Sequence, residues 1–251
     1  MKVIQIQSQL QRLAVSMFAC GMLLGEQPKA APQPAPDEAI RQYLMSHPEV
    51  ILQSLKGYQV RQKQANQERA RHAVIAAHEE LVNDVASPSA GNPKGLAVVE
   101  FFDYQCGYCK KVNPVLTELL KTNPNVRVVF KELPILGPDS MLGSKASLAA
   151  KKQGAYLRFH DALMAASEPV TMEMIEKTAT QLGLNVARLK ADMKSPEIDE
   201  AIVRNSELAE KLNVRATPAF VIGSEVVAGA VDAGRLAKLV EAEAAVLTTK
   251  K

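Results

Sequence analysis

A Cys-x-x-Cys motif between an apolar run and a helical pattern limits what this 251-residue chain can be. The run at 96–102 is rich in Val and Phe and predicts a buried strand. Cys106 and Cys109 follow it, and a helical pattern starts at once. A dithiol that opens a helix after a strand is typical of proteins that exchange thiols and disulfides. The motif therefore predicts redox chemistry at these two cysteines.

The overall charge of the chain gives no reason to expect nucleic acid as a partner. The sequence has 30 Lys and Arg against 27 Asp and Glu, a net charge of +3, and the basic residues are dispersed. With 47% hydrophobic residues, the chain can bury a core for one large domain or two smaller ones. We therefore expect a soluble globular protein.

The first residues have the character of an export signal. Lys2 and Arg12 precede an apolar block at 13–24, which is too short to span a membrane. An ordinary buried helix is the alternative. We predict that 1–30 comprise a signal peptide and the start of a linker, and that the leader takes Cys20 with it. The mature protein is then expected in the periplasm, with association with the membrane left open.

The two remaining cysteines are better explained by chemistry than by stability. A disulfide between Cys106 and Cys109 would close a very short loop and would stabilise the fold little by that route. Two thiolates are too few for a structural zinc site, which takes four ligands, and the four histidines show no ligand spacing. We therefore expect no metal and no cofactor other than the redox-active Cys106–Cys109 disulfide.

Residues 37–86 have a helical pattern that cannot fold alone. Ser46 is a candidate N-cap for one long helix at 47–84, with apolar positions at both ends and a polar stretch between them. Self-association through 37–58 would cover the first apolar end. We therefore expect a homo-oligomer, with a dimer favoured and a trimer as the alternative. A solvated helix that packs locally is the competing interpretation.

A Ser/Gly/Pro-rich boundary at 87–95 precedes a domain of mixed α/β class, which we place at 95–251. Within it, strand, helix and strand follow in order, which predicts a parallel pair with a helical crossover. Gly223-Ser224 predicts a hairpin between the last two strands. The expected strands are 96–102, 126–132, 218–223 and 225–228, and the expected helical regions are 107–121, about 140–211, and 232–247.

The position of each cysteine predicts its role. Cys106 should lie at the first turn of a helix, where free backbone N–H groups and the helix dipole favour the thiolate and lower its pKa. Cys109 lies one turn further on and should be more buried. We therefore expect Cys106 to attack a substrate disulfide and Cys109 to resolve the mixed disulfide.

Three other features accompany the dithiol. Pro114 lies within the helix that follows the motif, where a kink is expected. Thr217-Pro218 stands at the start of a predicted strand. Glu100 and Lys131 lie on adjacent strands that are otherwise apolar, and a buried charge there needs a partner.

Over about residues 95–247 the chain resembles the thioredoxin-fold oxidoreductases of the DsbA type. The resemblance rests on Phe101-Phe102-x-x-x-Cys-x-x-Cys, Pro114 and Thr217-Pro218. It implies a thioredoxin fold with an inserted helical domain. The N-terminal helical region extends the likeness to the ScsC-like and Com-type relatives, which are oligomeric.

The same resemblance implies roles for the residues around the dithiol. Pro218 would be a cis proline that faces Cys106. The substrate would bind to Gly107, Tyr108, Thr217 and Pro218. Glu100 and Lys131 would form a buried charge pair that moves protons at the resolving thiol.

Two departures from the strongly oxidising members favour disulfide isomerisation. Gly107-Tyr108 replaces Pro-His between the cysteines, and Thr217 replaces Val. Losing two pKa units of thiolate stabilisation would make the disulfide a weaker oxidant by roughly 60 mV. We predict a periplasmic thiol:disulfide oxidoreductase and isomerase that acts on exported proteins and is reset by a membrane redox partner. A plain disulfide-introducing oxidant, and a copper(I)-binding or chaperone protein, are the alternatives.

Overall fold

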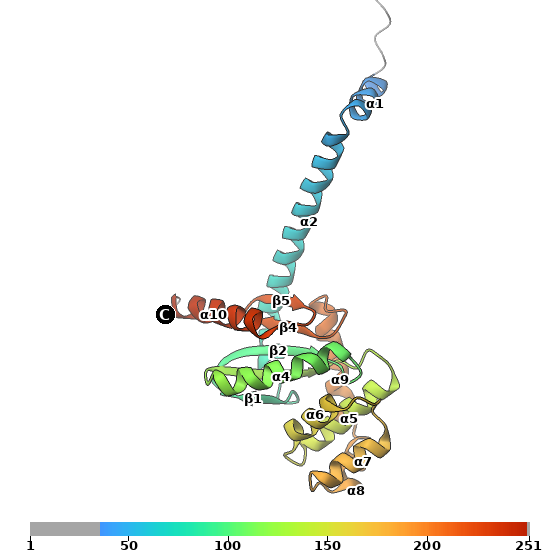
Figure 1. Ribbon diagram of the computed structural model, residues 1–251, viewed down its shortest axis with the longest axis vertical. Coiled ribbons are helices and arrows are strands. Elements are labelled where there is room, and N and C mark those ends of the chain that lie inside the picture. The colour runs from blue at the N-terminus through green and yellow to red at the C-terminus, as the bar shows by residue number, and fades with distance from the viewer. Residues whose placement is uncertain (1–35, 250–251) are drawn as a thin grey trace, which may run out of the picture. The chain divides into compact units, whose positions relative to one another are not determined.

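The structure is a computed structural model that describes residues 36–249 (Figure 1). The described residues fall into two units, divided between Lys56 and Gly57. The first unit contains α1 (Pro36–Ser46), in which no residue is buried, and the start of α2 (Pro48–Ala76). The predicted signal peptide at 1–30 lies outside the described residues.

Ser46 does not cap the second helix as the sequence suggested. It is the last residue of α1, and its hydroxyl donates to the carbonyl oxygen of Gln42 at 2.7 Å. The hydroxyl is therefore held by the preceding helical turn. Pro48 takes the first position of α2, where its missing N–H costs no hydrogen bond.

The single helix predicted at 47–84 is also wrong, because the chain leaves the helical conformation at Ala77. A short helix, α3 (His78–Val82), follows. Val74, Ala77 and Leu81 are buried against the sheet, so the chain turns to keep an apolar face on the core. The end of the region predicted at 37–86 is therefore part of the core of the second unit.

One five-stranded sheet organises the second unit, in the order β1-β3-β2-β4-β5. Strands β2 and β3 are parallel, as predicted, and the other pairs are antiparallel. The strands are β1 (Ser89–Gly91), β2 (Leu96–Phe102), β3 (Val126–Glu132), β4 (Ala219–Ile222) and β5 (Glu225–Ala228). No sequence pattern predicted β1, a three-residue edge strand within the Ser/Gly/Pro-rich boundary.

The helical insertion lies between β3 and β4, close to the predicted bounds, and Figure 1 shows α5 to α8 gathered beside one end of the sheet. The remaining helices are α4 (Gly107–Thr122), α5 (Pro138–Lys151), α6 (Tyr156–Ala165), α7 (Met172–Gln181), α8 (Val186–Asp192), α9 (Pro196–Lys211) and α10 (Ala233–Thr249). Gly154 and Gly183 end α-helical segments with positive φ angles of 71° and 72°, which glycine adopts without strain.

The sheet separates two apolar cores because side chains alternate between its faces. On β2 and β3 the even-numbered side chains pack with α4, α10 and the insertion, and the odd-numbered ones pack with α3 and α9. The first set includes Val98, Phe102, Val128 and Phe130, and the second includes Val99, Phe101 and Val129. This division decides which charged residues can meet below the dithiol.

Candidate functional site

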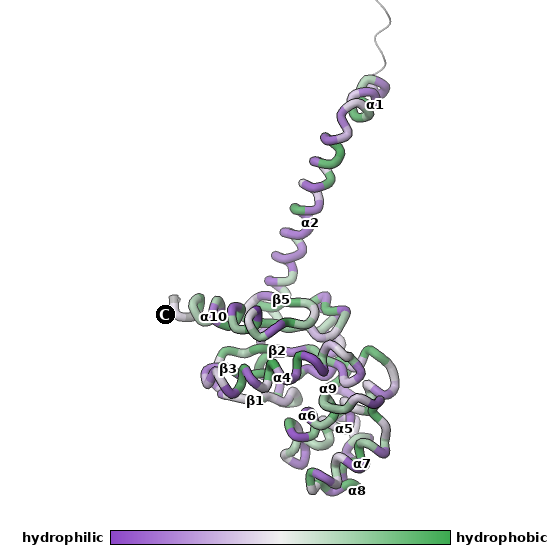
Figure 2. The backbone as a smooth tube through the Cα atoms, in the orientation of Figure 1, coloured by the Kyte–Doolittle hydropathy of each residue, from purple (hydrophilic) through white to green (hydrophobic). Residues whose placement is uncertain are grey.

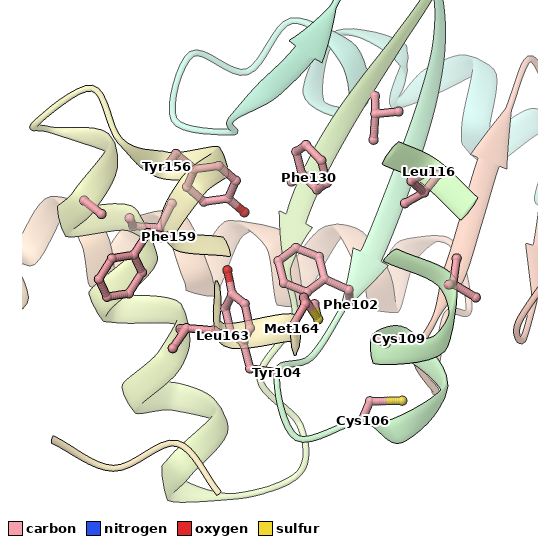
Figure 3. Close-up of a cluster of buried hydrophobic side chains, with 14 of the residues drawn as sticks. Phe102, Tyr104, Cys106, Cys109, Leu116, Phe130, Tyr156, Phe159, Leu163 and Met164 are labelled. Carbon is pink, nitrogen blue, oxygen red and sulfur yellow. The ribbon is translucent and has the colours of Figure 1, made fainter. Parts of the chain in front are cut away.

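The dithiol lies where β2 leads into α4 (Figure 3). Cys106 directly precedes α4 in an extended conformation, and Cys109 lies in its first turn. Cys106 keeps 6% of its surface exposed and Cys109 none, so only the first sulfur can be approached by another protein. The two thiols are not bonded to each other in this structure.

The Thr217-Pro218 segment faces Cys106, and its peptide bond is cis. The thiol of Cys106 donates to the carbonyl oxygen of Thr217, with a sulfur–oxygen distance of 3.2 Å. Sheet pairing brings the two together, because Ala219 at the start of β4 lies opposite Phe101 near the end of β2. The geometry expected from the resemblance is therefore present at this position.

The residues between the cysteines face outward. Gly107 and Tyr108 are both exposed, and the Tyr108 ring lies 5.5 Å from the ammonium nitrogen of Lys111. Pro114 lies within α4, as predicted. Tyr108 therefore offers an aromatic surface next to the Cys106 thiol.

Asp103, which the sequence reasoning passed over, fixes the loops around the dithiol. Its carboxylate accepts the backbone N–H groups of Gln105, Ile135 and Leu136 at 2.7, 2.8 and 3.0 Å. Its carbonyl oxygen accepts the N–H of Cys106. The loop after β2 is thus tied to the loop after β3. An Asp two residues before the N–H that it accepts is a common turn signal, and it could have been recognised at Asp103-x-Gln105.

Glu100 lies buried beneath the dithiol without a partner for its charge. Its side chain is 1% exposed, and Oε1 has no hydrogen-bond partner among the described residues. Burial, and then the negative charges of Cys106 and Glu132, raise the pKa of Glu100 to about 8. Burial raises the pKa of Cys109 as well, and the charge of Glu100 adds to that effect. Glu100 and Cys109 therefore affect each other's ionisation.

Lys131 does not pair with Glu100, which corrects the expected charge pair. In the parallel register Glu100 lies opposite Phe130, and Lys131 lies opposite Phe101. The two charged side chains consequently point to opposite faces of the sheet.

On its own face the Lys131 ammonium is fully satisfied. It forms a salt bridge with Asp84 at 3.3 Å and also donates to the Glu80 carbonyl oxygen and to Ser87. Burial lowers the pKa of Lys131, and Asp84 opposes that shift. Lys131 is therefore a structural cation that joins β3 to α3 and to the segment after it.

Glu132 is the second acid that the sequence reasoning missed. It ends β3 on the same face as Glu100 and is completely buried. Its carboxyl oxygens accept hydrogen bonds from Tyr156 at 2.8 Å and Ser144 at 2.8 Å, and lie 3.3 Å from the hydroxyl of Tyr104. Burial raises the pKa of Glu132 to about 8, although these hydrogen bonds oppose the shift.

Comparison with known proteins places residues 97–241 under a family model described as a DSBA-like thioredoxin domain. A thioredoxin-like oxidoreductase from Silicibacter pomeroyi shares 40% identity over 65% of this chain and 95% of its own, with a TM-score of 0.63. The catalytic domain of Proteus mirabilis ScsC shares 33% identity over 70% of this chain and 98% of its own, at a TM-score of 0.64. BcfH of Salmonella enterica Typhimurium shares 29% identity over 82% of this chain and 93% of its own, with a TM-score of 0.69.

Curated relatives include the thiol:disulfide interchange protein DsbA of Bordetella parapertussis, 25% identical over 62% of this chain and 77% of that protein. A Na(+)/H(+) antiporter NhaA of Salinispora tropica is 27% identical over 75% of this chain. The chain spans only 30% of that antiporter's length. Across residues 36–249, every helix is too short or too polar to cross a membrane.

Proposed function

We propose that this chain, which belongs to the DSBA-like thioredoxin family, is a periplasmic thiol:disulfide oxidoreductase that also isomerises disulfides in exported proteins. The supporting observation is the position of Cys106. Its partly accessible sulfur lies at the start of α4 and 3.2 Å from the carbonyl oxygen of Thr217. Cys109 is buried directly behind it.

The reaction follows from these positions. The Cys106 thiolate attacks a substrate disulfide, one substrate sulfur leaves as a thiolate, and a mixed disulfide forms. The Cys109 thiol gives its proton to the Glu100 carboxylate and attacks the Cys106 sulfur. The second substrate sulfur then leaves, so the substrate is reduced and the Cys106–Cys109 disulfide forms. The reverse sequence oxidises a substrate dithiol, and a membrane redox partner would reset the cysteines.

Isomerisation needs only the first half of this sequence. Another substrate thiolate attacks the substrate sulfur of the mixed disulfide and releases Cys106 unchanged, so no net oxidation occurs. A substrate can do this while it remains bound. Exposed apolar side chains around Cys106 would hold such a substrate, since Ile135 and Leu136 are 46% and 54% exposed and Tyr108 is 63% exposed. Gly107 and the Thr217-Pro218 backbone complete this surface.

The N-terminal helices would assemble the oligomer. Large apolar side chains are exposed along α1 and the start of α2, and Figure 2 shows a more hydrophilic stretch after them. They are Ile40, Tyr43, Met45, Ile51, Leu52, Leu55, Tyr58 and Val60. Because exposed apolar surface of this extent is typical of an interface, we place self-association here, with a dimer favoured over a trimer.

The test adds the reduced full-length protein to a scrambled multi-disulfide substrate and follows recovery of that substrate's activity. The wild type should restore activity, and Cys106→Ser should not. Exchange at the wild-type rate in Cys106→Ser would refute the mechanism. Oxidation of a reduced substrate without any recovery of the scrambled one would identify a plain oxidant instead.

The role of the helices is tested with Ile51→Glu/Leu55→Glu, which leaves the buried Val74, Ala77 and Leu81 intact. Gln62→Glu, an exposed change in the polar part of α2, is the matched control. Light scattering should show that the double variant dissociates and the control does not. The double variant should also lose recovery of the scrambled substrate. Unchanged mass would place the interface elsewhere.

A further inference from the structure

A chain of buried polar groups connects Glu132 to the surface of the protein. It runs from Glu132 to Tyr104, then to His160 on α6, and on to Asn113 on α4. Asn113 ends the chain at the exposed carboxylate of Asp161. Figure 3 shows the Tyr104 and Tyr156 rings in the space between Phe130 of the sheet and the helical insertion. The proposed chemistry makes no use of these groups.

The outer end of the chain fixes the direction of its hydrogen bonds. The Asn113 amide nitrogen lies 3.0 Å from Asp161, and a carboxylate can only accept. The amide oxygen of Asn113 therefore faces Nε2 of His160, 3.1 Å away. Because burial lowers the pKa of His160 to about 3, its ring carries a single N–H in neutral solution. That hydrogen is on Nε2, so Nδ1 of His160 is an acceptor.

The hydrogen of Tyr104 then has two acceptors. The hydroxyl oxygen lies 3.0 Å from Nδ1 of His160 and 3.3 Å from Oε1 of Glu132, but it carries one hydrogen. If Tyr104 donates to the nearer His160, its oxygen can act only as an acceptor, toward Glu132 as well as toward the neighbouring hydroxyls of Ser147 and Tyr156. A proton on Glu132 satisfies this arrangement. If Glu132 is ionised, either Nδ1 of His160 or Oε1 of Glu132 faces a lone pair of the Tyr104 oxygen instead of its hydrogen.

We propose that this chain of hydrogen bonds holds Glu132 protonated in neutral solution, and that Glu132 is a positioning residue for Glu100. A proton on Glu132 removes the negative charge that would otherwise face Glu100 across the same side of the sheet. Glu100 can then ionise more readily and accept the proton of Cys109. This last consequence rests on the proposed function of Glu100, whereas the protonation of Glu132 does not.

The surroundings of Glu132 are consistent with a neutral acid. Two carboxyl groups face Glu132, that of Glu100 on β2 and that of Asp103 in the loop after β2. Both disfavour a further negative charge on Glu132. Ser144 of α5, and Tyr156 and His160 of α6, supply the other polar groups, and none of them carries a positive charge there. Lys131, the adjacent cation, lies on the opposite face of the sheet.

The test is infrared spectroscopy of the reduced full-length protein, in which a protonated carboxyl gives its own C=O band. Glu132→Gln should lose one such band in neutral solution, and that band is thereby assigned. Asp161→Ala frees the Asn113 amide to turn over, so that Tyr104 can donate to an ionised Glu132. In that variant the band should titrate about one pH unit lower, a tenfold change in the ionisation constant. Glu118→Ala, an exposed change on α4, is the control.

Two results would overturn the inference: a wild-type spectrum identical to that of Glu132→Gln, or an Asp161→Ala titration that follows the wild type. A purely structural role for Asp161 predicts the second result. The disulfide-exchange assay separates this inference from the proposed function. An active protein without the band refutes only the role of Glu132, whereas an inactive wild type with the band refutes only the proposed function.

Discussion

Replacing Glu100 by Gln should stabilise the protein increasingly as the pH rises. Gln has nearly the same shape and cannot ionise. The pKa of Glu100 is raised to about 8 in the folded protein, mainly by burial, against an ordinary 4.5. The folded state therefore holds this proton more tightly than the unfolded state. The resulting stabilisation is complete below pH 4.5 and is lost as the pH rises through about 8.

The size of the loss follows from the two pKa values. A difference of about 3.5 pKa units, at about 1.4 kcal/mol each, corresponds to about 5 kcal/mol in total. Between about pH 5 and pH 9 the wild type should lose about 4 kcal/mol more unfolding free energy than Glu100→Gln. Near neutral pH, the wild type should have lost about 3 kcal/mol of unfolding free energy relative to its value well below pH 4.5, and Glu100→Gln should not show this loss.

Urea unfolding across this pH range measures the difference. Both proteins should keep Cys106 and Cys109 in the reduced state, because the charge of Cys106 contributes to the raised pKa of Glu100 and titration of the thiols is common to both. Glu118→Gln is the matched control and should follow the wild type. It changes an exposed acid on α4, the helix that packs on the same face of the sheet as Glu100. Stability curves for Glu100→Gln and the wild type that stay parallel within about 0.5 kcal/mol would refute the argument that Glu100 is a buried, unpaired acid.

Four further substitutions test the geometry around the site. Gly143→Ala should cost about 1–3 kcal/mol in thermal unfolding, because its Cβ would lie 2.9 Å from the buried Tyr104 ring; an unchanged melting temperature would contradict this packing. Asp84→Ala should lower the free energy of unfolding by about 3 kcal/mol, because it leaves the Lys131 ammonium without its carboxylate. Lys131→Met should leave the rate of exchange with a small disulfide unchanged. A large fall in that rate would restore a redox role for Lys131. Asp103→Asn should release Ile135 and Leu136 and raise KM for unfolded protein substrates more than for small disulfides, as steady-state kinetics with both substrates would show.

Local patterns were sufficient to predict much of the redox domain. The apolar run into the dithiol gave β2, and the turn at Gly223-Ser224 gave the closing hairpin. The break at Ala77 could not be predicted in the same way, because no Gly or Pro marks it and only packing on the sheet causes it. The role of Glu132, and the bonds from Asp103 to Ile135 and Leu136, were missed because these partners lie far along the chain.

The error over Lys131 has a specific physical cause. Two neighbouring parallel strands can be recognised from their composition, but their register cannot, and a shift of one residue moves a side chain to the other face. The observed register places Glu100 opposite Phe130, so Lys131 is excluded from the dithiol side of the sheet. A charge pair inferred from two adjacent strands therefore depends on a register that the sequence did not provide.

The absence of Lys131 from that face bears on how Glu100 can work. A carboxylate paired with a buried ammonium is held ionised and is a weak proton acceptor, because its pKa falls. The thiol of Cys109 has a raised pKa and is therefore a weak acid. Proton transfer is most efficient when donor and acceptor have similar proton affinities. A carboxyl whose pKa is raised to about 8 is therefore better matched to Cys109 than a salt-bridged one would be. The separation of the two charges across the sheet is therefore favourable for the proposed transfer of a proton from Cys109 to Glu100.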